Sequence, residues 1–151
     1  MNIIILGCGR TGSTLATSLG REGHTVSIID RSTDAFRRLG ADFSGNKIVG
    51  NGTDEAVLKK AGIEAANAFV AVTNGDNTNI MSVQIAKDRF NVRKVVTRIK
   101  DPIRACAYRD LGIETICTTM IGARVIKDYI MEKDLGPIGE YCALSDDEAV
   151  L

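Results

Sequence analysis

The chain begins MNIIILGCGRTG, in which an apolar run from Asn2 to Leu6 leads directly into Gly7-Cys8-Gly9-Arg10-Thr11-Gly12. A G-x-G-x-x-G segment between a strand and a helix is the fingerprint of dinucleotide binding. Its first glycine permits a tight turn, its second lets the backbone approach a diphosphate, and its third allows the helix to pack closely on the strand. The amide groups at the start of the helix then face the phosphates. This stretch therefore predicts a strand, a phosphate-binding turn and a helix.

Short, apolar, β-branched runs recur between longer helical patterns in the rest of the chain. We predict six strands, at Asn2–Leu6, Thr25–Ile29, Lys47–Val49, Ala68–Val72, Lys94–Arg98 and Glu114–Cys117. Helices are expected to begin near Arg10, Thr33, Asp54, Asn77, Pro102 and Thr119. Because the runs are apolar on both faces, the alternation predicts an α/β fold: a Rossmann-like, doubly wound, parallel six-stranded sheet in a single domain.

The residue composition of the sequence changes after Lys133. Gly136, Pro137 and Gly139 interrupt any helical pattern there, and an acidic cluster follows. We therefore assign residues 1–133 to a nucleotide-binding domain and residues 134–151 to a short C-terminal tail or linker. The same segment also fits the start of a second domain, because a Gly/Pro hinge after a helix commonly joins domains.

Composition narrows the class of protein. Of the 151 residues, 44% are hydrophobic and 25% charged, as in an ordinary globular protein. Nineteen basic residues balance nineteen acidic ones, which argues against nucleic-acid binding. No apolar run approaches the ~20 residues that span a bilayer, and no signal peptide precedes the glycine loop. The four cysteines are scattered and only one histidine accompanies them, so we expect no metal site and a cytoplasmic protein with reduced thiols.

An acidic residue stands where the ribose of a bound nucleotide is expected. Asp30 closes the second predicted strand, at the spacing from Gly12 at which a carboxylate receives ribose hydroxyls. Arg31 beside it leaves a second reading open, because a guanidinium can accommodate the extra phosphate of NADP or lie over adenine. We favour NAD or ATP over NADP.

Two polar loops follow the third and fourth predicted strands, at the edge where open α/β sheets bind ligands. The first contains Asn51, Gly52 and Thr53, and the second contains Thr73, Asn74, Gly75 and Asn79. Their glycines and amides suit contacts to adenine and ribose, although such residues also serve ordinary turns. Arg98 ends the fifth strand at the same edge and is a candidate phosphate contact.

Catalytic machinery is not evident in the sequence. Tyr129 and Lys133 have the Tyr-x-x-x-Lys spacing of short-chain reductases, but the chain is too short for that scaffold and the glycine loop has another arrangement. No phosphate loop with a Gly-Lys-Thr ending is present for NTP hydrolysis. We therefore expect a ligand sensor and no catalytic residues, with a small NAD-dependent oxidoreductase as the alternative.

Six segments in order carry a family resemblance: GCGRTG, VSIIDRS, VGNGTDE, FVAVTNGDNTNIMSVQIAK, VVTRI and DPIRACAYRDLGIETIC. Together, from about Met1 to Lys133, they resemble the KTN (RCK N-terminal) nucleotide-binding domain of TrkA/KtrA-type potassium-uptake regulatory subunits. The resemblance implies a cytoplasmic subunit that binds NAD(H) or ATP/ADP and gates a membrane potassium transporter or channel. It also implies a ring-shaped homo-oligomer, held at the inner face of the plasma membrane through its partner.

The resemblance also assigns residue roles. It implies phosphate contacts at Gly7, Gly9 and Gly12, a ribose contact at Asp30 and an adenine side at residues 51–53. Arg10 matches a family arginine that can contact phosphate near a subunit interface, and Thr73, Asn74 and Asn79 match the polar loop after the fourth strand.

The sequence departs from the family pattern in two places. Thr118 and Thr119 stand where the family often has a proline or an acid, which places a cation site there in doubt. The family's C-terminal sensing domain is not found after Lys133, which fits either a short regulator or a fragment. A helix from Thr119 to Lys133 carries more apolar residues than one sheet needs to cover it, which suggests self-association, although a packed crossover helix explains it equally.

Overall fold

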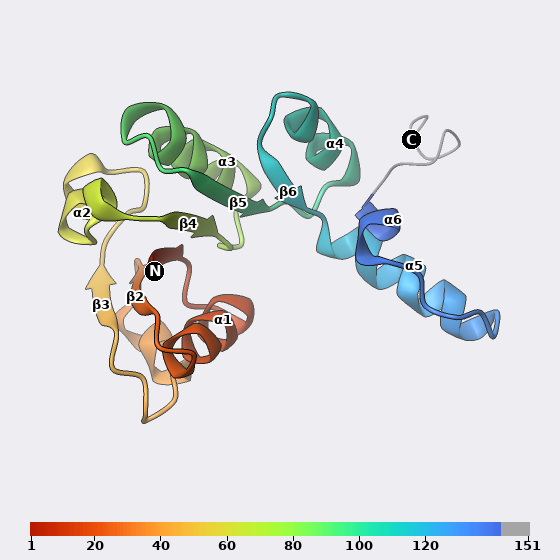
Figure 1. The fold of residues 1–151 in the computed structure, drawn as a ribbon, viewed down its shortest axis with the longest axis horizontal. Helices are drawn as coiled ribbons and strands as arrows, with labels where there is room; N and C mark the ends of the chain where they lie inside the picture. The colour runs from red at the N-terminus through yellow and green to blue at the C-terminus, as the bar shows by residue number, and fades with distance from the viewer. Residues whose placement is uncertain (143–151) are drawn as a thin grey trace. The chain divides into compact units, whose positions relative to one another are not determined.

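The computed structural model describes residues 1–142 and confirms the predicted α/β fold (Figure 1). Six strands form one sheet in the order β3-β2-β1-β4-β5-β6. The strands are β1 (Asn2–Leu6), β2 (Thr25–Asp30), β3 (Asn46–Val49), β4 (Ala68–Ala71), β5 (Lys94–Arg98) and β6 (Glu114–Ile116). The pairs from β3 to β5 are parallel, with Ile5 of β1 opposite Ile28 of β2 and Val70 of β4. The strand order reverses beside β1, which is the point where such sheets bind ligands.

The chain divides into two compact units, Met1–Thr97 and Arg98–Leu151. In the first unit, β1 and β2 are buried on both faces, as their isoleucine-rich sequences predict, with Ile5 and Ile28 fully buried. Helix α1 (Arg10–Arg21) packs Ala16 against this core, joined by Ala35 and Leu39. The glycine loop therefore follows a strand that is buried from Ile3 to Leu6.

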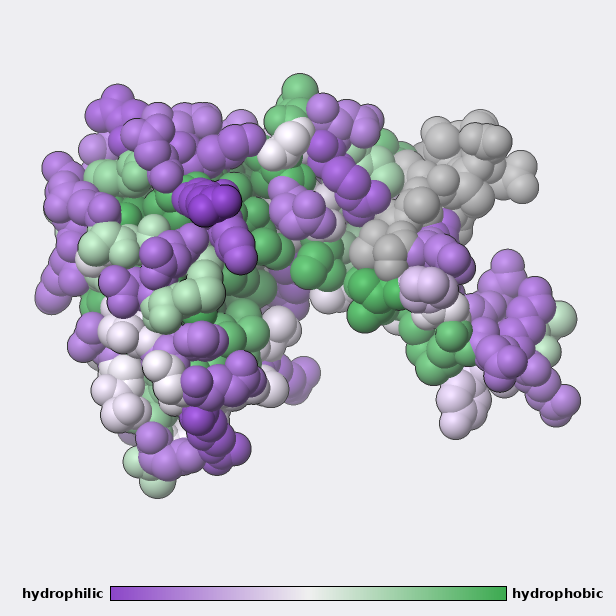
Figure 2. Space-filling view, viewed as in Figure 1, coloured by the Kyte–Doolittle hydropathy of each residue, from purple (hydrophilic) through white to green (hydrophobic). Residues whose placement is uncertain are grey.

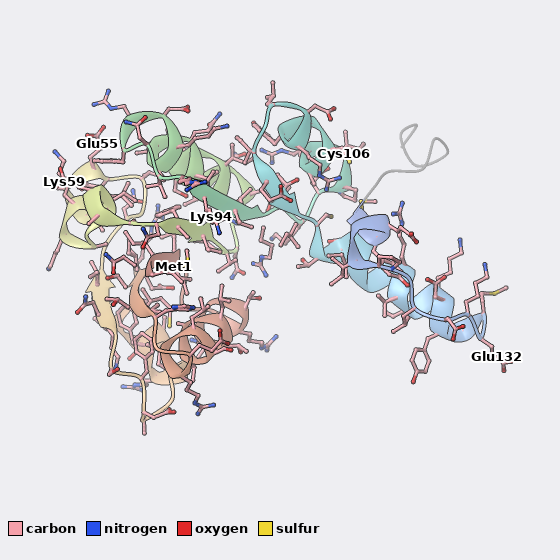
Figure 3. All side chains as sticks on the ribbon, in the orientation of Figure 1. Met1, Glu55, Lys59, Lys94, Cys106 and Glu132 are labelled. Carbon is pink, nitrogen blue, oxygen red and sulfur yellow. The ribbon has the colours of Figure 1, made fainter. Side chains whose placement is uncertain are left out.

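The helices of the first unit begin close to the predicted positions. They are α1, α2 (Glu55–Lys60), α3 (Asp76–Gln84), a π-helical turn η3 (Ile85–Arg89) and the 3-10 segments η1 (Thr33–Arg38) and η2 (Ile63–Ala65). Asp54 caps α2, because its side chain accepts a hydrogen bond from the Ala56 amide. Glu55 and Lys59 project from α2 (Figure 3), and Glu55 pairs with Arg89 at 3.1 Å.

Some element boundaries differ from the sequence prediction. Asp30 and Asn46 belong to strands, whereas Val72 and Cys117 lie just outside them. The segment expected to form a helix from Thr33 is a short 3-10 helix that ends at Arg38. Only Ala35 and Phe36 of its six residues pack against the core, so little buried surface is available to support a longer helix.

The second unit contains β6, α4 (Pro102–Asp110), α5 (Thr118–Ile130) and α6 (Ile138–Cys142). Asp101 caps α4 by accepting a hydrogen bond from the Arg104 amide, and Pro102 occupies the first turn, as predicted. The hydroxyl of Thr115 in β6 donates to the carbonyl of Ala105 in α4 at 2.8 Å. Cys106 of α4 is half-buried (Figure 3).

The segment expected as a tail begins with an ordered helix. The Tyr141 hydroxyl donates to an Asp128 carboxylate oxygen at 2.9 Å and accepts from the Gly136 amide at 2.8 Å. Arg124 of α5 donates to the Glu140 carbonyl. Burial and the bond to Asp128 raise the pKa of Tyr141. These contacts pack α6 on α5, while the predicted acidic stretch lies outside the described residues and the domain boundary at Lys133 stays a prediction.

Among residues 1–142, no helix has the length and hydropathy needed to cross a bilayer. Within the same range, no group of three or more His, Cys, Asp or Glu side chains is arranged to hold a metal ion.

Candidate functional site

The glycine loop has two packed glycines and one open glycine. Gly7 has φ +102°, a left-handed conformation that favours glycine, and a Cβ there would lie 3.0 Å from the Thr73 amide nitrogen. A Cβ on Gly12 would overlap the carbonyl oxygen of Gly7. Around Gly9, in contrast, a Cβ would meet nothing within 4 Å. The open space over Gly9 is where the fingerprint predicts that a diphosphate approaches the backbone.

Helix α1 begins directly after this open glycine. Gly9 is its N-cap residue, and the Ser13 amide is the first to bond back, to the Gly9 carbonyl at 2.9 Å. The amides of Arg10, Thr11 and Gly12 come before that bond, at the helix end where N–H groups have no intrahelical partner. Their partial positive charge favours an anion at this end.

Asp30 forms hydrogen bonds with residues that follow three strands, β1, β2 and β3. One carboxylate oxygen accepts from the Cys8 amide at 2.7 Å, and the other accepts from the Ser32 amide at 2.9 Å. The Asp30 carbonyl accepts from the Gly50 amide, which follows β3. The loops after β1, β2 and β3 are thus held in a row. A carboxylate has about four lone-pair sites, so Asp30 retains capacity for hydroxyl donors such as those of a ribose.

Cys8 has a structural role in the glycine loop. Its side chain is fully buried, and the thiol donates to the Ala35 carbonyl at 3.3 Å. Burial and then the Asp30 carboxylate raise the pKa of Cys8, which keeps the thiol protonated and unreactive. The Cys8 amide donates a hydrogen bond to the Asp30 carboxylate. A direct contact between Cys8 and a ligand remains a prediction.

The loop after β3 brings Arg31 and Asn51 together. Arg31 Nη2 donates to Asn51 Oδ1 at 2.9 Å, and the Thr53 amide donates to the same oxygen at 3.3 Å. A Cβ on Gly52 would overlap the side chain of Leu6, so this glycine lets the loop lie directly against β1. Arg31, Asn51 and Thr53 are therefore connected by hydrogen bonds in the loops that follow β2 and β3, and their contact with a nucleotide stays a prediction.

The loop after β4 is organised by Asn79. Asn79 is fully buried in α3, and its Oδ1 accepts from the amide of Thr73 at 2.9 Å and from its hydroxyl. Its Nδ2 donates back to the Thr73 carbonyl at 3.0 Å. The Thr73 backbone in turn lies against Gly7. Asn79 therefore shapes the loop from beneath, whereas Asn74 and Gly75 are exposed at its tip.

Arg98 is the remaining candidate. It is the first residue of the second unit, whereas all the other candidates belong to the first. Its contact with a phosphate stays a prediction.

The structure also contains a polar groove that the sequence reasoning missed. It encloses about 470 Å³ and is lined by Ser13, Thr14, Thr17, Ser18, Arg21, Glu22, Arg38 and Gly40. The Arg21–Asp42 ion pair, 2.7 Å long, flanks it, and the Arg21 guanidinium holds the pKa of Asp42 below its usual value. The repeated hydroxyl residues on one face of α1 are the signal that could have indicated it.

Comparisons with known proteins agree with the family resemblance. A family model described as the TrkA-N domain matches residues 3–119. Trk system potassium uptake protein TrkA of Streptomyces coelicolor is 51% identical over 118 residues, 78% of this chain and 53% of that protein. A TrkA homolog of Pyrococcus horikoshii is 38% identical over 111 residues, 74% of this chain and 49% of that protein. The chain thus spans about half the length of these curated relatives.

Solved structures show the same fold. The Kef CTD of Shewanella denitrificans in its AMP-bound form has a TM-score of 0.75 at 22% identity, covering 93% of this chain and 86% of that one. The GsuK channel bound to NAD has a TM-score of 0.73 at 23% identity, covering 87% of this chain and 23% of that one. GsuK bound to ADP also has a TM-score of 0.73 at 23% identity, covering 88% and 34%.

Proposed function

Because the chain belongs to the TrkA-N domain family, we propose that it is the nucleotide-sensing regulatory domain of a potassium-uptake system. The curated relatives are named as Trk potassium uptake proteins. The partner proposed for this chain is a membrane potassium transporter or channel subunit, contacted from the cytoplasmic side.

The ligand we propose is an adenine nucleotide, NAD(H) or ATP/ADP. The observation that carries this proposal is the open space over Gly9, between the two packed glycines and beside the unbonded start of α1. Asp30 stands next along the same edge with lone pairs left for ribose hydroxyls. Structures of the same fold bound to NAD, ADP and AMP support this choice.

The mechanism is a shift between arrangements of the domain. A nucleotide can change an equilibrium only by binding one arrangement more tightly than another. Arg10 is exposed at the start of α1, where its charge can distinguish ligands with different numbers of phosphates. No bond is made or broken in this scheme, so consumption of NADH with an alcohol or hydroxy acid would favour the oxidoreductase alternative.

Gly9→Val is expected to weaken ADP and NAD binding by roughly a hundredfold, or about 2.7 kcal/mol. Gly9 has φ −76° and ψ −167°, which a β-branched residue adopts readily, so the fold is retained while the side chain fills the space meant for the diphosphate. Titration calorimetry measures the affinity.

Thr14→Val on the exposed surface of α1 is the matched control and should leave both affinities unchanged. Growth of a potassium-uptake mutant at low potassium, complemented with the full-length protein, links binding to function. A Gly9→Val protein that binds nucleotide and complements as well as wild type would contradict the proposal.

We also propose that α5 mediates self-association. Ile126, Tyr129 and Ile130 lie on one face of the helix and are 61%, 79% and 74% exposed. Figure 2 shows hydrophobic residues among hydrophilic ones on the surface of α5. Clustered exposed apolar side chains commonly mark an interface.

Ile130→Glu is expected to lower the molar mass in solution at least twofold, because it places a charge in an interface that excludes water. Multi-angle light scattering measures the mass. Lys59→Glu also introduces an acid at an exposed helix position, on α2 and outside α5, and should not change the molar mass. Equal masses for wild type and Ile130→Glu would show that the face does not mediate assembly.

A further inference from the structure

The polar groove beside α1 has a second wall, formed by a turn that follows η1. The Phe43 amide donates to the Gly40 carbonyl at 3.0 Å and closes this turn. The Phe43 ring lies over Gly20 of α1, and Asp42 pairs with Arg21 at 2.7 Å. A Cβ on Gly40 would overlap the Asp42 carboxylate, so the glycine leaves room for that side chain. An ion pair and an apolar contact therefore hold the two walls together.

The lining of the groove is polar. It consists of four serine and threonine residues along one face of α1, two arginines, one glutamate and one glycine. Such a lining offers hydrogen bonds and charge but little apolar surface, so an apolar protein segment would gain little free energy by docking there. A small ligand with several polar groups matches the donors and acceptors of this lining.

The charges that line the groove are not all used by its own ion pair. Arg21 and Asp42 neutralise each other. Glu22 accepts from the Ser18 hydroxyl at 3.1 Å through one oxygen, so its second oxygen can still accept a hydrogen bond. Arg38 forms no ion pair with any residue that the structure describes. The groove thus offers a cation at Arg38 and a carboxylate at Glu22.

These two charges lie at different levels of the groove. The chain after η1 runs alongside α1 in the same direction, because Gly40 lies beside Thr17 and the ion pair joins the two segments one helical turn later. Arg38, just before Gly40, lies toward the start of α1, whereas Glu22 lies at its end. From the rise of a helix and the length of extended residues, the two charges are roughly 10 Å apart along the groove.

We propose that this groove binds a short linear zwitterion, such as a peptide of about three residues with free termini, which spans roughly 10 Å when extended. Its carboxylate pairs with Arg38 and its ammonium group pairs with Glu22. The Thr17 hydroxyl lies between these charges, where it can donate to or accept from a peptide group. The lining residues differ from the proposed nucleotide contacts, so this is a second site, and it does not depend on the proposed function.

An NMR titration of the folded, isotope-labelled protein with triglycine tests this proposal. Triglycine is expected to bind saturably and to shift the amide signals of Thr17, Arg38 and Gly40. The signal of Asn74, which is exposed on another loop, should stay in place.

Blocked forms of the same peptide test each charge. N-acetyltriglycine lacks the ammonium group and triglycinamide lacks the carboxylate, so each should bind roughly fivefold more weakly, as expected for the loss of one exposed ion pair. The compound ω-aminooctanoate has the same number of bonds between its charges but no peptide groups. It should also bind more weakly than triglycine, because the hydroxyl groups of the lining lose their partners.

Substitutions in the groove identify the partner of each terminus. Arg38→Gln should no longer distinguish triglycine from triglycinamide, and Glu22→Gln should no longer distinguish triglycine from N-acetyltriglycine. Arg37→Gln is the matched control, because Arg37 is the neighbouring exposed arginine and pairs with Asp34 on η1. It should retain the wild-type affinity for triglycine. Thermal melting verifies that each variant is folded.

The outcomes separate this site from the nucleotide site. Absence of saturable triglycine binding by folded wild type, or shifts confined to residues outside the groove, would overturn the proposal and leave nucleotide binding in place. Equal affinities for triglycine and its two blocked forms would overturn the assigned roles of Arg38 and Glu22, as would an equal loss in Arg37→Gln and Arg38→Gln. Absence of ADP and NAD binding would contradict the proposed function alone.

Discussion

Gly12→Ala should lower the free energy of unfolding by about 3 kcal/mol or more, at the upper end of the range for overpacked sites. The added methyl group would overlap the carbonyl oxygen of Gly7. Gly7 cannot move away, because its left-handed turn already lies against the Thr73 backbone. Helix α1 would have to separate from β1, which also disrupts the glycine turn between them. Chemical denaturation measures the change.

Gly9→Ala is the control for this prediction. It is the same substitution in the same loop, but the methyl group enters open space and the backbone is extended. Its stability should equal that of wild type or exceed it slightly, since alanine restricts the unfolded chain more than glycine does. Equal losses of stability at Gly9 and Gly12 would show that helix packing is not what Gly12 provides.

Asn79→Ala should lower the free energy of unfolding by roughly 3 kcal/mol. The substitution removes three hydrogen bonds between Asn79 and Thr73, and a typical hydrogen bond contributes about 0.5–1.5 kcal/mol. Because Thr73 supports Gly7, the affinity for ADP should fall as well. Denaturant titration and calorimetry measure the two effects.

Asn74→Ala is the control for the Asn79 prediction, since Asn74 occupies the exposed tip of the same loop. It should change stability by less than about 0.5 kcal/mol, as surface substitutions usually do. If Asn79→Ala were as stable as Asn74→Ala, the buried hydrogen bonds to Thr73 would not be what holds the loop.

Local chemistry explains why most of the fold was predictable. The isoleucine-rich centres of β1 and β2 are buried at successive positions, as in strands covered on both faces, with Ser27 the one polar residue among them. Asp54 and Asp101 mark helix starts because a short carboxylate satisfies the first amides of a helix. Sterics explains Gly7 and Gly12, because a Cβ on either would crowd neighbouring backbone, whereas a Cβ on Gly9 would enter open space. The sequence pattern predicted the structure less well from Thr33 to Arg38, where a longer helix was expected and a short 3-10 helix forms.

By itself, the amino-acid sequence determined the alternation of strands and helices, the glycine turn before α1 and the acid at the end of β2. These follow from periodicity and backbone sterics, which act between neighbours. Only the tertiary structure decided that Asp30 bonds Cys8, that Arg31 bonds Asn51 and that Asn79 supports Thr73 from within the core. Cys8 and Asp30 are 22 residues apart in the sequence, and the pairing of β1 with β2, in which Leu6 lies opposite Ile29, brings them together. Such contacts depend on strand register and on where each side chain points, and a linear pattern of residue types contains neither.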